Sequence, residues 1–509
     1  MKLKTRVVLR GIILLAGLLA AAPMDAATAK VASCDSLASA VLPNATITST
    51  QSVLAGGFTM PGRGGGAALD LPAFCRVAIT IEPTSDSDIK LEVWLPTASW
   101  NGKLLAVGNG GWAGSIRYAD MVQPLKRGYA TASTDTGHAG GGARFAMGHR
   151  EKLIDYAYRS EHEMTLKAKA IIEAFYGDPA RHAYWNGCSG GGKQALTEAQ
   201  RYPDDYDGII AGAPANNAMH LHAERLWVAQ AVHKDPAGYI PPSKYPVLHN
   251  AVLEACDVLD GVKDGVLENP RRCHFDPAVV ACKAGDAANC LTASQVEAAR
   301  KIYSGAKNPR TGEQIFPGLE PGGELLWDRL AGPQPLGLAI ENFKYVVFQN
   351  PDWDYLSLNF DGDVALADKL DDDINKSMDP NLKPFTGHSG KLLMYHGWSD
   401  QQVPPRNTIN YYDSVIKTLG AARTTDSVRL FMVPGMGHCG GDVGTDTFDM
   451  VSVIEQWVEN GKAPDRIPAA HLTDGKPDRT RPLCPYPQVA VYIGIGSTND
   501  AGNFVCKAP

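Results

Sequence analysis

The chain is organised around residues 183–200, whose sequence is AYWNGCSGGGKQALTEAQ. The apolar start predicts a strand and residues 193–200 predict a helix, with a glycine-rich turn between them that carries Ser189. Small residues on both sides of Ser189 permit a strained backbone that lifts its hydroxyl clear of the chain. The helix that follows offers the N–H of Gly190 and the positive end of its dipole to an oxyanion. We interpret this stretch as a nucleophile elbow, against the alternative of an ordinary serine in a glycine-rich turn.

Length and composition set the limits for the rest of the molecule. The 509 residues suffice for one large domain plus another, or for a single core that carries a large insertion. Hydrophobic residues make up 44% of the chain and charged residues 20%, which indicates a globular protein with an ample core. The net charge of −7 provides no basic surface, so we expect no nucleic-acid partner.

The N-terminal segment has the pattern of a secretory signal peptide. Four basic residues precede an apolar run at 11–22, and Ala27-Thr28-Ala29 follows as a plausible cleavage site. A bilayer span needs about 20 apolar residues, and this run is shorter, so a permanent anchor is the less favoured alternative. We therefore expect a signal peptide over 1–29 and a mature protein that is secreted or periplasmic, with no membrane contact after the signal is removed.

Strand patterns lead up to the elbow. Residues 77–81 and 89–95 alternate like strands, and 103–107 runs directly into a glycine-rich loop, GNGGWAG, at 108–114. A loop of this kind, after a buried strand and upstream of the elbow, is where a second oxyanion donor is expected, from Gly110 or Gly111; a simple tight turn is the alternative. Strand and helix then alternate to residue 213, which predicts a parallel sheet.

The alternation stops after residue 216. Residues 217–385 contain helical stretches such as 220–233 and 294–303, separated by loops rich in proline and glycine. We interpret this segment as an inserted domain, called the lid, that covers the site and shapes the substrate pocket. The catalytic domain would then comprise residues 30–216 and 386–509.

One loop of the lid is a candidate cation site. Asp257, Asp260 and Asp264 are separated by glycine turns, and three carboxylates can converge with backbone carbonyls around a hard cation such as Ca²⁺. The spacing of the acidic residues differs from that of an EF-hand. A solvated acidic loop is the alternative.

Two further catalytic candidates follow the lid. The strand-like residues 391–395 lead to Asp400, and the strand-like residues 428–433 lead to His438. The order Ser189, Asp400, His438 is that of the α/β-hydrolase fold, with each member placed after its own strand. In this arrangement His438 removes the Ser189 proton and Asp400 holds the imidazole. His396 is a competing base, although it precedes the acid, and otherwise a residue of the pocket.

The ten cysteines of an exported chain are most simply read as disulfides. Pairing of neighbours along the chain accounts for eight of them, as Cys34–Cys75, Cys256–Cys273, Cys282–Cys290 and Cys484–Cys506. The remaining two, Cys188 and Cys439, are adjacent to Ser189 and His438. A bond between them would tie nucleophile to base, whereas the alternative is two free buried thiols.

These motifs together resemble the tannase and feruloyl esterase family, which also includes mono(2-hydroxyethyl) terephthalate hydrolase. The resemblance rests on GCSGG at 187–191, HGWSD at 396–400, GHC at 437–439 and the aspartate loop, and it extends over nearly all of the mature chain. It implies an α/β-hydrolase with a lid and five disulfides paired as above. It also implies a structural Ca²⁺ in the lid, bound by the three aspartates and the carbonyls of Val262 and Val266.

The resemblance implies aromatic acyl groups, as in ferulate or gallate esters, as substrates. The terephthalate-ester enzyme has an aromatic residue three positions after the acid, where this chain has Val403, and this difference disfavours that substrate. We therefore expect a secreted serine carboxylesterase for feruloyl or galloyl esters. The alternatives are an esterase for other aromatic esters, such as terephthalate monoesters, a serine peptidase, or an inactive binding protein on the same scaffold.

Overall fold

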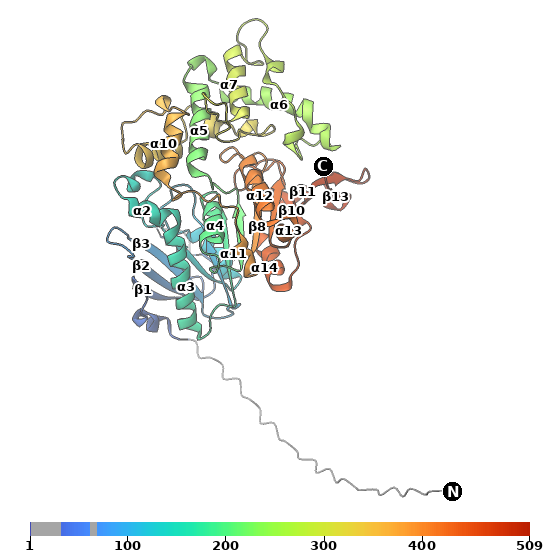
Figure 1. Cartoon of the computed structure of the whole chain (residues 1–509). Coiled ribbons are helices and arrows are strands. Elements are labelled where there is room, and N and C mark those ends of the chain that lie inside the picture. Colours follow the sequence, from blue (N-terminus) through green and yellow to red (C-terminus); the bar gives the residue numbers. More distant parts are fainter. Residues whose placement is uncertain (2–31, 62–68) are drawn as a thin grey trace.

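A computed structural model describes the chain apart from residues 2–31 and 62–68 (Figure 1). Apart from Met1, the expected signal peptide therefore lies outside the described residues. The centre is a nine-stranded sheet with the order β1-β2-β3-β5-β4-β6-β7-β8-β9. Its strands are β1 (Ala45–Val53), β2 (Phe74–Ile81), β3 (Ile89–Pro96), β4 (Lys103–Val107), β5 (Ala130–Thr134), β6 (His182–Cys188), β7 (Gly208–Gly212), β8 (Lys391–Gly397) and β9 (Val428–Val433).

The sheet is mixed. From β5 to β9 neighbouring strands are parallel, as the alternation of strand and helix predicts. The first three strands instead pair antiparallel, and β3 joins β5 antiparallel as well. This arrangement is the α/β-hydrolase fold, with an antiparallel meander at one edge.

Successive residues of the central strands point to opposite faces, and both faces are covered. On one face Leu104 and Ile209 pack with the apolar sides of α3, α4 and α12. On the other face Leu105 and Ile210 pack against α14. The helices of this domain are α1 (Tyr118–Lys126), α2 (Arg150–Ile154), α3 (Ser160–Tyr176), α4 (Gly190–Arg201), α12 (Arg406–Leu419), α13 (Ala421–Ser427) and α14 (Met450–Asn460).

The segment between β7 and β8 is helical and lies at one end of the sheet, drawn green to orange in Figure 1. It has apolar clusters of its own, one around Trp327 and one around Phe343. At its end Leu382 and Phe385 pack back into the core of the sheet. Its helices are α5 (Ala218–His233), α6 (Tyr245–Cys256), α7 (Ala293–Ser304), α8 (Asp328–Ala331), α9 (Gly337–Glu341), α10 (Gly362–Asp371) and α11 (Lys383–Gly387).

The C-terminal part adds two antiparallel hairpins, β10 (Ile467–Thr473) with β11 (Lys476–Leu483), and β12 (Val489–Tyr492) with β13 (Phe504–Lys507). The ten cysteines form five disulfides, and every pair is the expected one. The pairs are Cys34–Cys75, Cys188–Cys439, Cys256–Cys273, Cys282–Cys290 and Cys484–Cys506.

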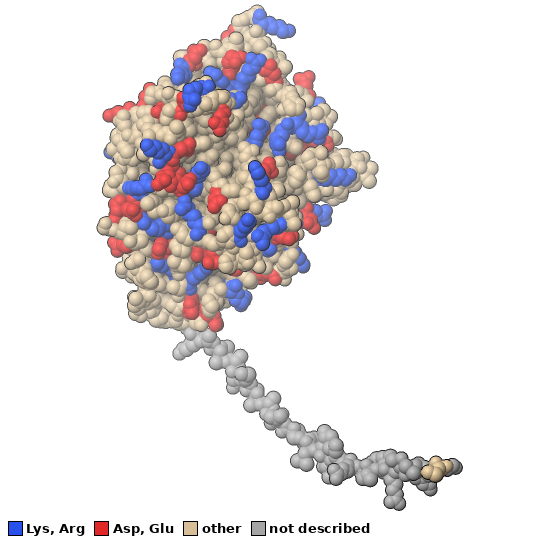
Figure 2. All heavy atoms as spheres, in the orientation of Figure 1, with Lys and Arg blue, Asp and Glu red and all other residues tan. Residues whose placement is uncertain are grey.

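Charged side chains of both signs are interspersed over the face shown in Figure 2. That face carries no extended basic surface of the kind that binds nucleic acid. Among the described helices, none combines the length and the apolar character that crossing a bilayer requires.

Candidate active site

The predicted elbow is a sharp turn between the end of β6 and the start of α4. Ser189 has φ 63° and ψ −117°, a conformation that is costly for any residue other than glycine and is typical of functional sites. The turn is pressed against the next strand: a Cβ atom added at Gly192 would lie 2.1 Å from the carbonyl oxygen of Gly212 on β7. Only glycine fits at position 192. The close packing of α4 against β7 holds the turn, and with it Ser189, at the end of the sheet.

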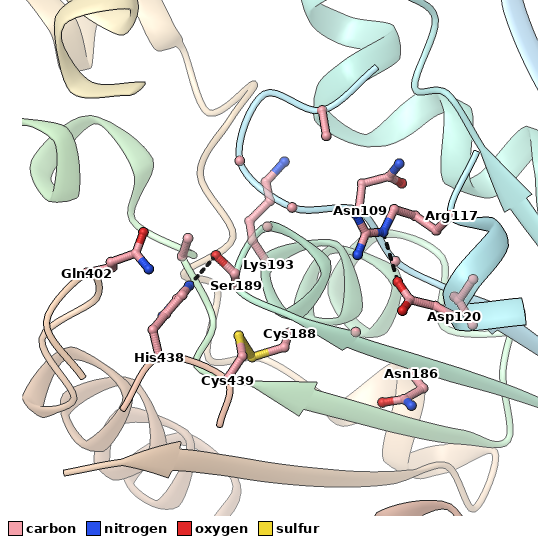
Figure 3. Close-up of a pocket in the computed structure, with 18 of the residues that line it drawn as sticks. Asn109, Arg117, Asp120, Asn186, Cys188, Ser189, Lys193, Gln402, His438 and Cys439 are labelled. Atoms are coloured by element: carbon pink, nitrogen blue, oxygen red, sulfur yellow. Dashed lines mark hydrogen bonds and ion pairs between the residues drawn. A yellow bond between two sulfur atoms is a disulfide. The ribbon is translucent and has the colours of Figure 1, made fainter. Parts of the chain in front are cut away.

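Ser189, His438 and Asp400 form one hydrogen-bonded chain, part of which is drawn in Figure 3. The Ser189 hydroxyl lies 2.9 Å from Nε2 of His438, and Nδ1 of His438 lies 2.7 Å from Oδ2 of Asp400. Because Nδ1 donates to the carboxylate, Nε2 is left to accept the serine proton. Asp400 follows β8 and His438 lies in the loop after β9, so the parallel strands bring the three side chains together.

The environment of Asp400 keeps its carboxylate ionised. Its side chain is fully buried, and Oδ1 accepts hydrogen bonds from the backbone N–H groups of Gln402 at 2.8 Å and Val403 at 2.9 Å. Burial by itself would raise the pKa of Asp400. The charge of His438 and the hydrogen bonds from His396 and His438 outweigh burial and hold this pKa well below its ordinary value.

His396 lies behind the aspartate and does not contact the pocket. Its Nε2 is 3.1 Å from Oδ2 of Asp400 and 2.9 Å from the carbonyl oxygen of Val403, and its Nδ1 accepts from the Thr408 hydroxyl at 2.8 Å. The suggestion that His396 lines the pocket is wrong, because its ring is completely enclosed between β8 and α12. Its position makes it a support of Asp400, whereas the partner of Ser189 is His438.

The glycine-rich loop after β4 packs against the start of α4. A Cβ atom added at Gly190 would lie 3.2 Å from the backbone nitrogen of Gly111 and 3.5 Å from the carbonyl carbon of Gly110. The Gly110 carbonyl accepts from Ala113, and the Gly111 carbonyl accepts from the Tyr156 hydroxyl at 2.7 Å. These contacts favour Gly111 over Gly110 as the second oxyanion donor, beside Gly190.

A buried polar network that sequence analysis missed fixes this loop. The backbone N–H of Asn109 donates to Oε1 of Gln194 on α4 at 2.8 Å, and the Asn109 side chain donates to the carbonyl of Thr134 at 2.9 Å. Gln194 in turn donates to Glu161 of α3, whose pKa is raised by burial. In the sequence, the one indication of this network is Asn109, a polar residue inside the glycine-rich loop.

The disulfide Cys188–Cys439 joins the residue before Ser189 to the residue after His438. It connects positions 251 residues apart in the chain, with a Cα–Cα distance of 6.0 Å, and both cysteines line the pocket (Figure 3). Nucleophile and base come from different strands, so this bond is the covalent tie between their loops.

Replacing this disulfide with the double variant Cys188→Ala/Cys439→Ala is expected to lower the melting temperature and kcat/KM together. Chain-entropy arguments assign about 5 kcal/mol to closing a loop of this length. We expect a fall in kcat/KM of roughly 10-fold or more, because a 1 Å misplacement of a catalytic group is already that costly. Thermal unfolding and initial ester-hydrolysis rates measure the two effects.

The matched control is Cys282→Ala/Cys290→Ala, which removes a disulfide that spans eight residues in the lid. It is expected to lower stability less and to leave kcat/KM close to that of the unmodified protein. Equal activities in the two double variants would contradict a role for Cys188–Cys439 in positioning the triad.

The triad opens into a cavity of about 750 Å³ lined by both the sheet domain and the lid. Its aromatic walls are Trp112, Tyr156 and Tyr395, and the indole of Trp112 stacks on His222 of α5 with 5.8 Å between ring centroids. Four other aromatic residues of the lid and of the loop before Asp400 do not line this cavity: Phe348, Trp353, Tyr355 and Trp398. Val403 is buried as well, with Leu221 and Phe316.

The acidic loop of the lid begins where α6 ends. The carboxylate of Asp257 accepts from the backbone N–H of Gly265 at 3.1 Å, and that of Asp260 accepts from Val262 at 2.8 Å and Glu268 at 3.2 Å. Each aspartate therefore closes a turn of the loop, and the loop is folded around its own carboxylates.

The chemistry of this donor set suits a hard cation. All candidate donors are oxygens, and the carbonyls of Val262 and Val266 accept no hydrogen bond from the described residues. Two competing cations are present: Arg481 donates to Asp264 at 2.6 Å, and Arg479 lies 3.8 Å from the same carboxylate oxygen. Within the described part of the chain, no group of three His, Cys, Asp or Glu side chains is already clustered as a metal site.

Comparisons with known proteins agree with this geometry. The profile of a family described as Tannase and feruloyl esterase matches residues 75–507. An uncharacterised esterase of Xanthomonas campestris pv. campestris is 39% identical, with 98% of this chain and 94% of the relative aligned. A probable feruloyl esterase B-2 of Neosartorya fischeri is 33% identical, with 85% of this chain and 86% of the relative aligned.

Solved structures show the same architecture. Feruloyl esterase B from Aspergillus oryzae superposes with a TM-score of 0.88 at 31% identity, covering 93% of this chain and 99% of that one. Tannin acyl hydrolase from Aspergillus niger superposes with a TM-score of 0.77 at 24% identity, covering 92% and 93%, which is a likeness of fold.

Proposed function

Since the chain belongs to the tannase and feruloyl esterase family and is a carboxylic ester hydrolase, we propose that it cleaves esters of aromatic acids through a serine acyl-enzyme. The observation that carries the proposal is the hydrogen-bonded chain from Ser189 through His438 to Asp400 at the foot of an aromatic-walled cavity. Feruloyl and other hydroxycinnamoyl esters, or galloyl esters, are the proposed substrates, in line with the names of the relatives.

In the first step His438 Nε2 takes the proton of Ser189 as the serine oxygen attacks the ester carbonyl. The developing imidazolium is stabilised by Asp400 through Nδ1, at the 2.7 Å distance given above. We assign the oxyanion donors to the N–H groups of Gly190 and Gly111, and each such donor contributes about 3 kcal/mol to the barrier reduction.

In the second step His438 returns its proton to the leaving alcohol, and the C–O bond of the ester breaks. Water then attacks the acyl-Ser189 ester while His438 takes a proton from it as the base. The bond between the acyl carbon and the Ser189 oxygen breaks, His438 gives its proton to that oxygen, and the free acid is released. The net reaction consumes one water and one ester and produces one acid and one alcohol. No other reactant is needed.

Export of the protein is the second part of the proposal. Five disulfides are expected of a protein that matures in an oxidising compartment, and the basic and apolar pattern of residues 1–29 supplies the signal. We place the mature enzyme in the periplasm or outside the cell.

The third part is a structural Ca²⁺ in the lid, held by the side chains of Asp257, Asp260 and Asp264 and the carbonyls of Val262 and Val266. The all-oxygen donor set supports this assignment. Bound there, the cation would neutralise the carboxylates and brace the lid, and it would take no part in the hydrolysis.

Addition of Ca²⁺ to the metal-free protein is expected to raise its melting temperature. A ligand at about 100 times its Kd stabilises the folded state by roughly 3 kcal/mol. The variant Asp260→Asn should lose this response, whereas Asp352→Asn, which changes an exposed aspartate elsewhere in the lid, should keep it. The measurement is thermal unfolding with EDTA, with Ca²⁺ and with Mg²⁺; equal melting temperatures in all three would contradict the site.

The proposed function is tested by initial rates on methyl ferulate, methyl gallate, a terephthalate monoester and p-nitrophenyl acetate. We expect an aromatic ester to be hydrolysed faster than the acetate, and the preferred acid names the substrate class. Failure to hydrolyse any of the four would contradict the proposal and favour a binding protein on the same scaffold.

A further inference from the structure

Five cationic side chains line the catalytic cavity: Arg117, Arg127, Lys193, Arg225 and Arg329. Two of them pair with carboxylates, and a third, Lys193, has a backbone partner and a carboxylate nearby. Arg117 pairs with Asp120 at 2.8 Å, as drawn in Figure 3, and Arg127 pairs with Asp449 and Glu455 at 3.1 Å. Lys193 donates to the carbonyl of Ala157 and has the charge of Glu161 nearby.

Arg225, on α5, has only neutral partners. Its side chain is 4% exposed; Nε donates to the carbonyl oxygen of Gln402 at 3.0 Å, and Nη1 lies 3.4 Å from Nδ1 of His222. No carboxylate of the described residues forms an ion pair with it, and its second amino group has no hydrogen-bond partner among them. Burial lowers the pKa of Arg225 to about 10, although the charge of Asp400, which forms no ion pair with Arg225, acts in the opposite direction. The guanidinium therefore remains charged at neutral pH.

Arg329 lies on α8 and, like Arg225, is hydrogen-bonded to Gln402. Its Nε donates to Oε1 of Gln402 at 3.3 Å, and it too has no carboxylate partner within the described chain. Arg329 is exposed, which places it at the mouth of the cavity, whereas Arg225 is inside. Figure 3 shows Gln402 beside His438 and Ser189, so this pair of cations borders the reacting groups.

Asp400 acts on Arg225 without an ion pair and is already hydrogen-bonded to His438 and His396. A buried guanidinium without an ion-pair partner of its own is costly, and the charge of Arg329 adds repulsion. Proteins retain such a charge where an anion arrives to pair with it, and the planar fork of an arginine matches a carboxylate. The cavity side of Arg225 is open to such a group, since neither neutral partner occupies its free amino group.

We propose that this esterase selects esters that carry a free carboxylate, which binds Arg225 inside the cavity and Arg329 at its mouth. The inference rests on the proposed function and narrows its substrate class. The carboxylate belongs either to the acid part or to the alcohol part of the ester, and the two arms of the test separate these cases.

The test compares esters that differ only in charge. For the acid part, monomethyl terephthalate is compared with methyl 4-carbamoylbenzoate; for the alcohol part, benzoyloxyacetic acid is compared with benzoyloxyacetamide. We expect kcat/KM of the unmodified enzyme to be higher for the carboxylate in at least one pair, by about 10- to 100-fold, the range for a charged hydrogen bond.

Arg225→Gln should bring that ratio close to one and leave the rate on the neutral ester within a few-fold. Arg329→Gln, a change at an exposed position that does not threaten folding, should lower the ratio in part. Arg117→Gln, which removes a cation that already has a partner, should leave the ratio as it is. The ratio should also fall as salt is added, because ion pairing is screened.

Two results would overturn the inference. In one, the unmodified enzyme hydrolyses the neutral esters and shows no preference for the carboxylate in either pair. In the other, Arg225→Gln lowers kcat/KM for the charged and the neutral ester of a pair by the same factor. Arg225 would then serve only to hold the loop that contains Gln402. Hydrolysis of none of the esters would instead count against the proposed function itself.

Discussion

Ser189→Ala is expected to lower kcat/KM on the best aromatic ester by roughly 10⁴- to 10⁶-fold, with the fold unchanged. Without the hydroxyl no acyl-enzyme forms, and the remaining rate comes from water that the oxyanion donors and His438 assist. Alanine is smaller than serine, and the one side-chain hydrogen bond lost in the described structure is the one to His438. Initial rates and the melting temperature, measured on the same preparation, check both halves of the expectation.

Ser304→Ala is the matched control, since this serine lies exposed at the end of α7 in the lid. A fluorophosphonate probe should add its mass to the unmodified protein and to Ser304→Ala but not to Ser189→Ala. Retention of more than about one-hundredth of the rate in Ser189→Ala would identify another nucleophile.

Asp400→Asn is expected to lower kcat by about 10³- to 10⁴-fold and to change KM little. Oδ1 of Asp400 accepts from two backbone N–H groups and Oδ2 accepts from two histidines, so the side chain acts only as an acceptor. An asparagine keeps one oxygen. If that oxygen stays with the backbone, its amide N–H₂ faces Nδ1 of His438, which must then become the unprotonated nitrogen. Nε2 would carry the proton and would no longer accept one from Ser189.

Asp413→Asn, an exposed change on α12, is the control for this variant. The same assay decides between the two histidines. His438→Gln should abolish activity, whereas His396→Gln should lower it less, since His396 only supports Asp400. The opposite order would show that His396 is the base.

The core of the active site was predictable because its signals are local. A strand, a glycine-rich turn and a helix around Ser189 dictate an elbow wherever they occur together. Asp400 and His438 each follow a strand, so their order along the chain was enough to bring them to one edge of the sheet. The disulfide pairs were equally accessible, because four of the five close short stretches of chain.

The remainder of the site depends on contacts that no local pattern encodes. Arg225 and His222 lie on a helix of the lid whose polar residues are buried, against the usual rule that charge marks the solvent face. Gln194 and Glu161 are also buried, on α4 and α3, and their roles emerge only once those helices pack together. Trp112 was visible in the glycine-rich loop, but nothing in its neighbours revealed that it would form a wall of the cavity.

The lid leaves the sheet at β7 and returns at β8, and these two strands are hydrogen-bonded neighbours. The intervening 178 residues, 213–390, therefore begin and end at one place on an intact scaffold. A lid of another length or sequence can be grafted between the same two strands without altering sheet order or the tie between nucleophile and base. The lid's share of the cavity wall is thus encoded apart from the triad, whereas Trp112, Tyr156 and Tyr395 belong to the sheet domain. A library confined to the lid would vary the first share of the wall and keep the triad and the aromatic walls fixed.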